Sequence, residues 1–109
     1  MKPLSKSLRQ ANRYILFRIT CDDTITFSDL DTYLYLALSE WIGKFRMGKF
    51  DIQLVKDSVQ DDCAIIATNA KGLAEVRSAL ELTYLLGEKK VSLQTIKSSG
   101  TLKKLKTVR

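Results

Sequence analysis

Two kinds of apolar repeat alternate along this 109-residue chain, and their order leaves few folds open. Segments that are β-branched and aromatic, or that alternate apolar with polar residues, predict strands, whereas apolar residues three or four positions apart predict helices. The expected strands span residues 13–20, 49–56, 63–68 and 90–98. The expected helices begin at the caps Ser28 and Asn69 and run to about Phe45 and Gly87. Residues 63–68, CAIIAT, are apolar on both faces, which is typical of a central strand.

Each expected helix has one apolar stripe that would face the sheet. The stripes are Leu30, Leu34, Leu38, Trp41 and Phe45 in the first helix, and Leu73, Val76, Leu80 and Tyr84 in the second. The order β-α-β-β-α-β then predicts an α+β ferredoxin-like sandwich. Its four-stranded antiparallel sheet has the spatial order 4-1-3-2, with both helices on one face. Residues 1–12 are expected to be a flexible basic arm, 13–98 the domain and 99–109 a basic tail.

The composition argues against an enzyme that works alone. The chain has no histidine, no phosphate-binding loop and no dinucleotide fingerprint, and its two cysteines lack a metal-site spacing. The adjacent pairs Asp22–Asp23 and Asp61–Asp62 do not form a natural catalytic dyad, since neighbouring strand residues point to opposite faces. We therefore expect no catalytic residue, no metal site and no cofactor bound by this chain. Without an apolar signal segment or a membrane span, a cytoplasmic protein is expected.

Charge is distributed unevenly along the chain, which has a net charge of +6. Residues 1–18 hold five basic residues and no acid, residues 89–109 hold seven and no acid, and all 12 acids lie between them. In the expected topology both chain termini and the loop after the first helix lie at the same end of the sheet. The residues expected there to contact the phosphates of a polyanion such as RNA are Arg9, Arg13, Lys44, Arg46, Lys49, Lys71, Lys103 and Lys104. The alternative is a pair of solvated tails that keep the protein soluble.

Stacking of bases on the sheet is disfavoured, because the third strand has no aromatic residue and Tyr14 and Phe17 point to opposite faces. Both helices carry apolar residues beyond their stripes. These residues form either a protein-binding face or simply a broad core: Tyr35, Leu36, Ile42, Leu82, Leu85 and Leu86. The turn Ser99-Gly100-Thr101 could either offer backbone N–H groups to a phosphate or redirect the chain.

Several short motifs in a fixed order resemble a known family. They are RYILF at 13–17, FRMG at 45–48, AII at 64–66, VRSAL at 76–80 and SGTLKK at 99–104. Together they resemble the archaeal ribonuclease P protein component 2, the counterpart of the eukaryotic Pop-five subunit. The chain departs from the family pattern twice: Arg46 stands where the family has a glycine, and Ala67 where it often has an arginine.

The resemblance implies a non-catalytic subunit of ribonuclease P, which removes the 5′ leader from precursor tRNA. The ribonuclease P RNA would carry the Mg²⁺-dependent chemistry, and protein component 3 would be the direct protein partner. Neutralising phosphates would lower the folding cost of that RNA. Two alternatives share the expected topology: another RNA-scaffold protein, such as a ribosomal protein, and a small-molecule-binding regulatory domain.

Overall fold

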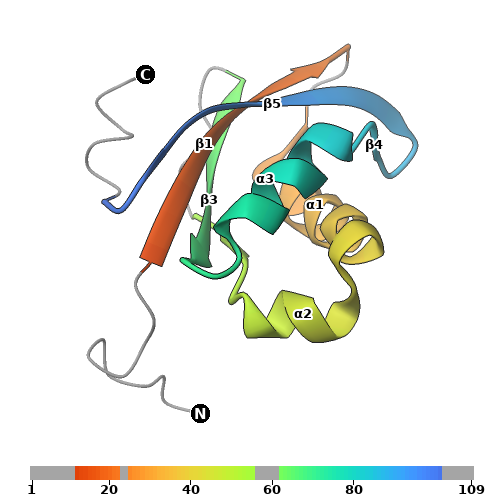
Figure 1. The fold of residues 1–109 in the computed structure, drawn as a ribbon. Coiled ribbons are helices and arrows are strands. Elements are labelled where there is room, and N and C mark those ends of the chain that lie inside the picture. Colours follow the sequence, from red (N-terminus) through yellow and green to blue (C-terminus); the bar gives the residue numbers. More distant parts are fainter. Residues whose placement is uncertain (1–11, 23–24, 56–61, 102–109) are drawn as a thin grey trace.

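A computed structural model describes residues 12–22, 25–55 and 62–101 of the chain (Figure 1). The elements, in chain order, are β1 (Asn12–Cys21), α1 (Phe27–Ile42), α2 (Lys44–Lys49), β2 (Gln53–Leu54), β3 (Cys63–Asn69), α3 (Leu73–Leu82), β4 (Leu85–Leu86) and β5 (Lys89–Ser99). The expected arm, residues 1–12, and the tail beyond Thr101 lie outside the described residues, apart from Asn12, which begins β1. Ser99, expected in the tail, ends β5.

The sheet has the order β2-β3-β1-β5-β4, and all its pairs are antiparallel. The four expected strands correspond to β1, β2, β3 and β5. Their order across the sheet, β5-β1-β3-β2, is the expected order 4-1-3-2. The expectation of four strands and two helices was wrong by one strand and one helix. The additional strand is β4, which pairs with the start of β5, and the additional helix is α2.

The main core lies between the sheet and the helices. The inward residues of β1, which are Ile15, Phe17 and Ile19, pack with buried residues of α1 and α3. Phe17 is completely buried, so its replacement by alanine would cost about 3–5 kcal/mol. α1 and α3 pack against each other over this face, which matches the expected two-layer arrangement.

The opposite face of the sheet is also apolar at its centre. Leu16, Cys63 and Ile65 are buried there, with Tyr14 and Val55 packed against them. The expectation that residues 63–68 are apolar on both faces is confirmed. Phe17 points into the main core and Tyr14 to this second face, so the two aromatic residues of β1 do separate as expected.

The first helix ends earlier than its apolar spacing suggested. Gly43 has φ 96°, a left-handed conformation that favours glycine, and it separates α1 from α2. The core stripe of α1 is therefore completed by Ile42, while Trp41 and Phe45 are exposed. The helix cap was also misassigned: Thr26, not Ser28, accepts a hydrogen bond from the backbone N–H of Asp29, at 3.2 Å.

The second helix was likewise expected to be too long. α3 ends at Leu82, and Gly87 lies in the turn between β4 and β5 with φ 66°, rather than stopping a helix. The backbone N–H of Val91 donates to the carbonyl of Tyr84 across this hairpin, at 3.0 Å. Asn69 ends β3 instead of capping the helix, and Gly72 precedes α3. Of the expected strand 49–56, the structure describes residues 49–55, and within these only Gln53 and Leu54 pair as a strand.

Candidate nucleic-acid interface

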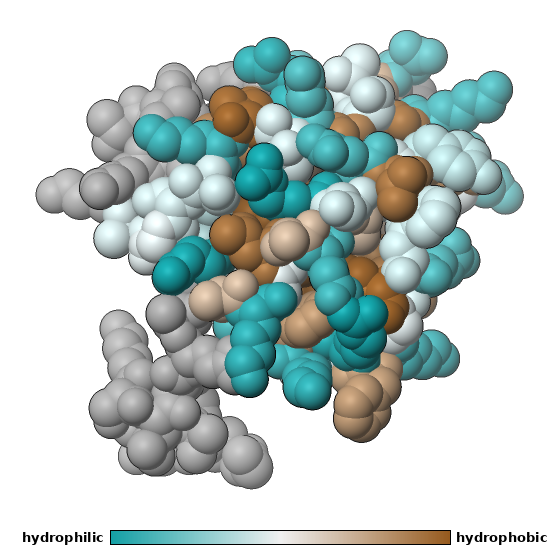
Figure 2. All heavy atoms as spheres, viewed as in Figure 1, coloured by the Kyte–Doolittle hydropathy of each residue, from teal (hydrophilic) through white to brown (hydrophobic). Residues whose placement is uncertain are grey.

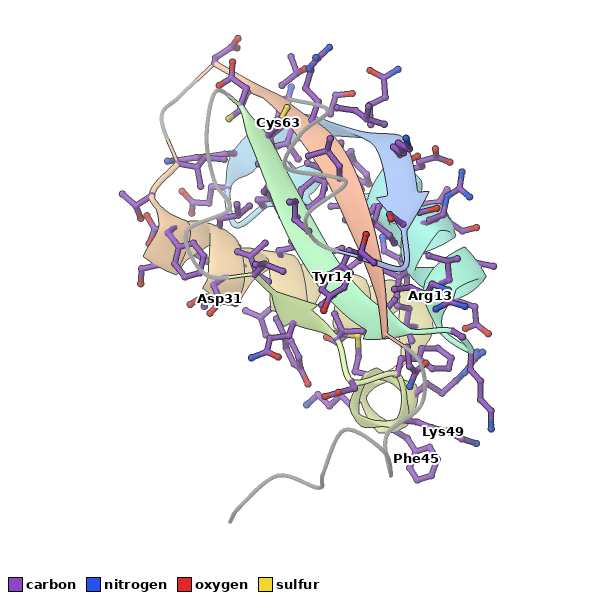
Figure 3. The ribbon with its side chains drawn as sticks, turned by 90° about the vertical axis from the view of Figure 1, so that its left-hand side faces the viewer. Arg13, Tyr14, Asp31, Phe45, Lys49 and Cys63 are labelled. Atoms are coloured by element: carbon purple, nitrogen blue, oxygen red, sulfur yellow. The ribbon has the colours of Figure 1, made fainter. Side chains whose placement is uncertain are left out.

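Three of the expected cations lie on the short helix α2. Lys44, Arg46 and Lys49 are exposed, whereas Met47 on the same helix is 1% exposed and Phe50, directly after it, is 5% exposed. The two buried side chains hold the helix against the main core, so its cations point outward. Figure 3 shows Lys49 projecting away from the sheet at this end of the molecule.

Buried polar side chains at the end of β3 fix the C-terminal end of α2. The Thr68 hydroxyl donates to the carbonyl of Phe50 at 2.7 Å, and the Asn69 side-chain amide donates to the carbonyl of Lys49 at 3.0 Å. The amide oxygen of Asn69 accepts from the backbone N–H of Gly72, also at 3.0 Å. We call Thr68 and Asn69 the β3 anchor. An anchor of this kind sets the position of Lys49 through the backbone, because unmade buried hydrogen bonds are costly.

Gly72 lets the β3–α3 turn approach this anchor closely. A Cβ atom at Gly72 would lie 2.6 Å from the Phe50 ring and 2.7 Å from the Thr68 hydroxyl. The expected RNA-binding residue Lys71 directly precedes this glycine and is exposed. The close approach therefore brings Lys71 to the same end of the molecule as α2.

Arg46 is engaged within the protein. Its guanidinium forms an ion pair with Glu75 of α3, and its central carbon lies 5.3 Å from the centroid of the Phe50 ring. Both charged groups are partly exposed, so the pair contributes about 0–1 kcal/mol to stability. Lys44, Lys49 and Lys71 form no ion pair with another described residue. The structure thus distinguishes a paired arginine from three lysines available to a phosphate.

The start of β1 and the end of β5 meet beside this region. Arg13 is paired in register with Thr68 of the β3 anchor, and Tyr14 with Ser99. A Cβ atom at Gly100 would lie 3.7 Å from the Arg13 guanidinium. The backbone N–H of Thr101 donates to the Ser99 hydroxyl at 3.1 Å, which favours a role for this turn in redirecting the chain. We call the described residues that meet here the basic end: Arg13, Lys44, Arg46, Lys49, Lys71 and 99–101.

The other expected RNA-binding residues are Arg9, Lys103 and Lys104, and all three lie outside the described residues. Lys89 and Lys90 also contribute to the charge of the C-terminal segment. They begin β5, whereas the basic end lies where β5 finishes, at Ser99. They line a surface hollow with three acids, Asp22, Asp29 and Glu88. Among the described residues, Lys89 and Lys90 thus lie at the end of β5 opposite the basic end.

The expected partner-binding residues fall into two groups. Ile42 and Leu86 are core residues, 7% and 2% exposed, because α1 ends at Ile42 and β4 packs against α1; they were wrong as surface candidates. Tyr35, Leu36, Leu82 and Leu85 are exposed. On the face drawn in Figure 2, apolar side chains are interspersed with hydrophilic ones instead of forming one continuous area.

Sequence reasoning missed two aromatic residues beside this group. Trp41 and Tyr84 are 50% and 65% exposed and line a groove between α1 and the β4 hairpin. We call it the aromatic groove: Ala37, Glu40, Trp41, Thr83, Tyr84 and Leu85. Trp41 lies three residues after Leu38 and Tyr84 four residues after Leu80, so their helical spacing predicted that both are buried in the core. Ile42 lies four residues after Leu38, which is also a helical spacing, and it fills the core position that was expected for Trp41.

The described part of the chain has neither a metal cluster nor a membrane span. No three His, Cys, Asp or Glu side chains within it are grouped as metal ligands would be. Among its helices, none has the length and apolar character needed to cross a membrane.

Comparisons with known proteins agree with this architecture. Residues 13–108 match the model of the Rpp14/Pop5 family. "Ribonuclease P protein component 2" of Methanobrevibacter smithii is 29% identical, over 94% of this chain and 92% of its own length. The protein of the same name from Pyrococcus abyssi is 27% identical, over 97% and 90%. A chain in the cryo-EM structure of yeast ribonuclease MRP has the same fold, with a TM-score of 0.69 and 20% identity over 94% of this chain and 92% of that one.

The chain therefore belongs to the Rpp14/Pop5 family. It is a ribonuclease P protein subunit, which places it in tRNA processing and confirms the resemblance drawn from its sequence motifs.

Proposed function

We propose that this subunit holds the ribonuclease P RNA with its basic end and contributes no catalytic group of its own. The observation that carries the proposal is the convergence of Arg13, Lys49 and Lys71 around the buried β3 anchor. Because the backbone that carries Lys49 is already fixed, binding a phosphate has to order only the lysine side chain and no segment of the chain. Contacts of this kind position an RNA without reading its sequence.

In this proposal the complete ribonuclease P complex of RNA and proteins removes the 5′ leader from precursor tRNA. In this proposal the RNA subunit carries the chemistry and binds the Mg²⁺ ions that it requires, and the protein binds neither a metal nor another cofactor. The protein lowers the repulsion between RNA phosphates, which reduces the Mg²⁺ concentration at which the RNA folds. A cytoplasmic location belongs to the same proposal, since Cys21 and Cys63 are free thiols.

Protein component 3 is proposed as the direct protein partner, with the aromatic groove and the neighbouring Leu82 as its docking surface. Exposed Trp and Tyr side chains are enriched at the centres of protein interfaces, whereas lysine is depleted there. The groove has two such aromatic residues, and none of the described residues that line it is a lysine or an arginine.

The test is reconstitution with the ribonuclease P RNA of the same organism, protein component 3 and precursor tRNA at limiting Mg²⁺. Wild-type protein should stimulate leader removal. The variant Lys44→Gln/Lys49→Gln should stimulate it much less. Lys89→Gln/Lys90→Gln is the matched control, because it removes the same charge at the opposite end of the sheet. Equal loss of stimulation in both variants would show that total charge, and not the basic end, matters; absence of stimulation by the wild-type protein would refute the proposed function.

A further inference from the structure

Phe45 is the most exposed large apolar residue in the described part of the chain. Its side chain is 84% exposed, compared with 65% for Tyr84 and 50% for Trp41. Single exposed apolar residues are common on protein surfaces. Phe45 differs from a scattered surface residue because it lies within the basic end, between Lys44 and Arg46.

The exposure of Phe45 does not come from a loosely held segment. Met47 and Phe50, the apolar neighbours of Phe45, are buried in the main core, and the β3 anchor bonds to the backbone at the end of α2. Side chains three and four positions apart share a helix face, so Phe45, Gly48 and Lys49 lie on one side of α2. Figure 3 shows Phe45 and Lys49 projecting together, away from the sheet.

The surroundings of the ring suit a flat, anionic ligand. A Cβ atom at Gly48 would have no other atom within 4 Å, so the space beside the ring on this helix face is open. Lys44 precedes Phe45, and Lys49 follows one helical turn later. α2 itself contains no acid, and the nearest ones in sequence are Glu40 in α1 and Asp51 after the end of α2. An exposed ring with Lys49 on its helix face and Lys44 next to it in the chain thus has room for a planar group and cations for its charge.

We propose that Phe45 stacks on an unpaired base of the bound RNA, while Lys44 and Lys49 contact the phosphates on either side of that base. This inference rests on the proposed function and adds a recognition mode to it. Aromatic side chains stack on unpaired RNA bases of any identity, because every base has a π face. The flanking lysines favour RNA over a protein partner, since lysine is depleted in the cores of protein interfaces. The basic end therefore prefers a loop, bulge or single-stranded end to a regular duplex.

Binding of the full-length protein to its ribonuclease P RNA tests this proposal. Phe45→Ala should weaken binding about tenfold, and Phe45→Leu should weaken it nearly as much, because leucine is apolar but cannot stack. Phe45→Trp should retain full affinity. The salt dependence should be the same in all three variants, since no phosphate contact is removed. Tyr33→Ala, which removes an exposed aromatic ring near the acidic hollow, is the matched control and should bind like the wild type.

A fluorescence measurement checks stacking directly. In the double variant Trp41→Phe/Phe45→Trp, the single tryptophan reports on position 45, since Trp41 is the only natural one. Adding the RNA should quench its emission, and a short single-stranded RNA should quench more than the same RNA in a duplex.

Three results would overturn the stacking proposal: unchanged affinity of Phe45→Ala, wild-type affinity of Phe45→Leu, or no quenching on RNA binding. Each of these leaves the proposed function intact when the wild-type protein still binds the RNA with a salt-dependent affinity. Failure of the wild-type protein to bind would instead refute the proposed function, and this inference with it.

Discussion

The basic end and the aromatic groove both lie beside the end of a helix, but they consist of different kinds of side chain. At the basic end, lysines stand on a six-residue helix whose backbone is held by two buried polar side chains of β3. In the aromatic groove, Trp41 and Tyr84 are exposed on segments held by ordinary apolar packing, beside one acid, Glu40. The first surface suits a polyanion and the second suits another protein. One small domain can therefore serve two partners that do not compete for the same residues.

The difference also concerns how each surface is kept in place. The position of Lys49 depends on hydrogen bonds made far below its charged group, so a change in the interior should move the basic end. The aromatic groove depends on the packing of α1 against β4, which involves neither member of the β3 anchor. Variants should consequently separate the two surfaces.

The largest expected effect is on the aromatic groove. Trp41→Ala/Tyr84→Ala should reduce the affinity for protein component 3 by at least about 30-fold, equivalent to about 2 kcal/mol, as for central interface aromatics. Titration calorimetry measures this loss. RNA affinity without component 3 should not change, because the basic end is untouched. Retained binding to component 3 would exclude the groove as its docking surface. Weaker RNA binding would contradict the claim that the groove and the basic end bind different partners.

The next effect concerns the close approach at the β3 anchor. Gly72→Ala should lower the free energy of unfolding by about 1–3 kcal/mol, because the new methyl group would overlap Phe50 and Thr68. Gly48→Ala is its counterpart in open space on α2, and it should raise stability by up to about 1 kcal/mol through helix propensity. Urea unfolding of both variants gives the comparison. Equal stabilities would mean that the anchor does not need the close approach of the β3–α3 turn.

The smallest expected effect is on the surface ion pair of the basic end. Glu75→Gln should change stability by less than about 1 kcal/mol, since the pair with Arg46 is partly exposed. It should also strengthen RNA binding several-fold at low salt, because it releases the guanidinium and removes a negative charge near the site. Affinity measured at two salt concentrations checks this. Weaker RNA binding by this variant would mean that Glu75 positions Arg46 for the RNA instead of competing with it.

The sequence predicted the long elements well and the short ones poorly. β1, β3 and β5 pair over seven or more residues, so their apolar patterns are decisive, and the order of the expected strands was right. The helix α2 has six residues and β4 has two, which is too short for a repeat of apolar residues to be recognised. Tertiary contacts decide both: Met47 and Phe50 bury one side of α2, and β4 forms by pairing with the start of β5.

The surface residues were missed for a related reason. Spacings of three and four residues are equally helical, so Trp41 and Ile42 compete for the position after Leu38, and Gly43 ends the helix before Phe45 can join the stripe. The pairing of Arg46 with Glu75 joins segments 29 residues apart, and no local pattern indicates it. The convergence of Arg13 with Lys49 and Lys71, in contrast, follows from topology alone and could be inferred before the structure.

The salt dependence of RNA binding tests the central claim most directly. Each phosphate contact contributes about 0.7–0.9 to the slope of log affinity against log salt concentration. Lys44→Gln/Lys49→Gln should therefore lower the slope by about 1.4–1.8, whereas Lys89→Gln/Lys90→Gln should leave it near the wild-type value. A wild-type slope in the first variant, or equal losses in both, would contradict the assignment of the RNA contact to the basic end.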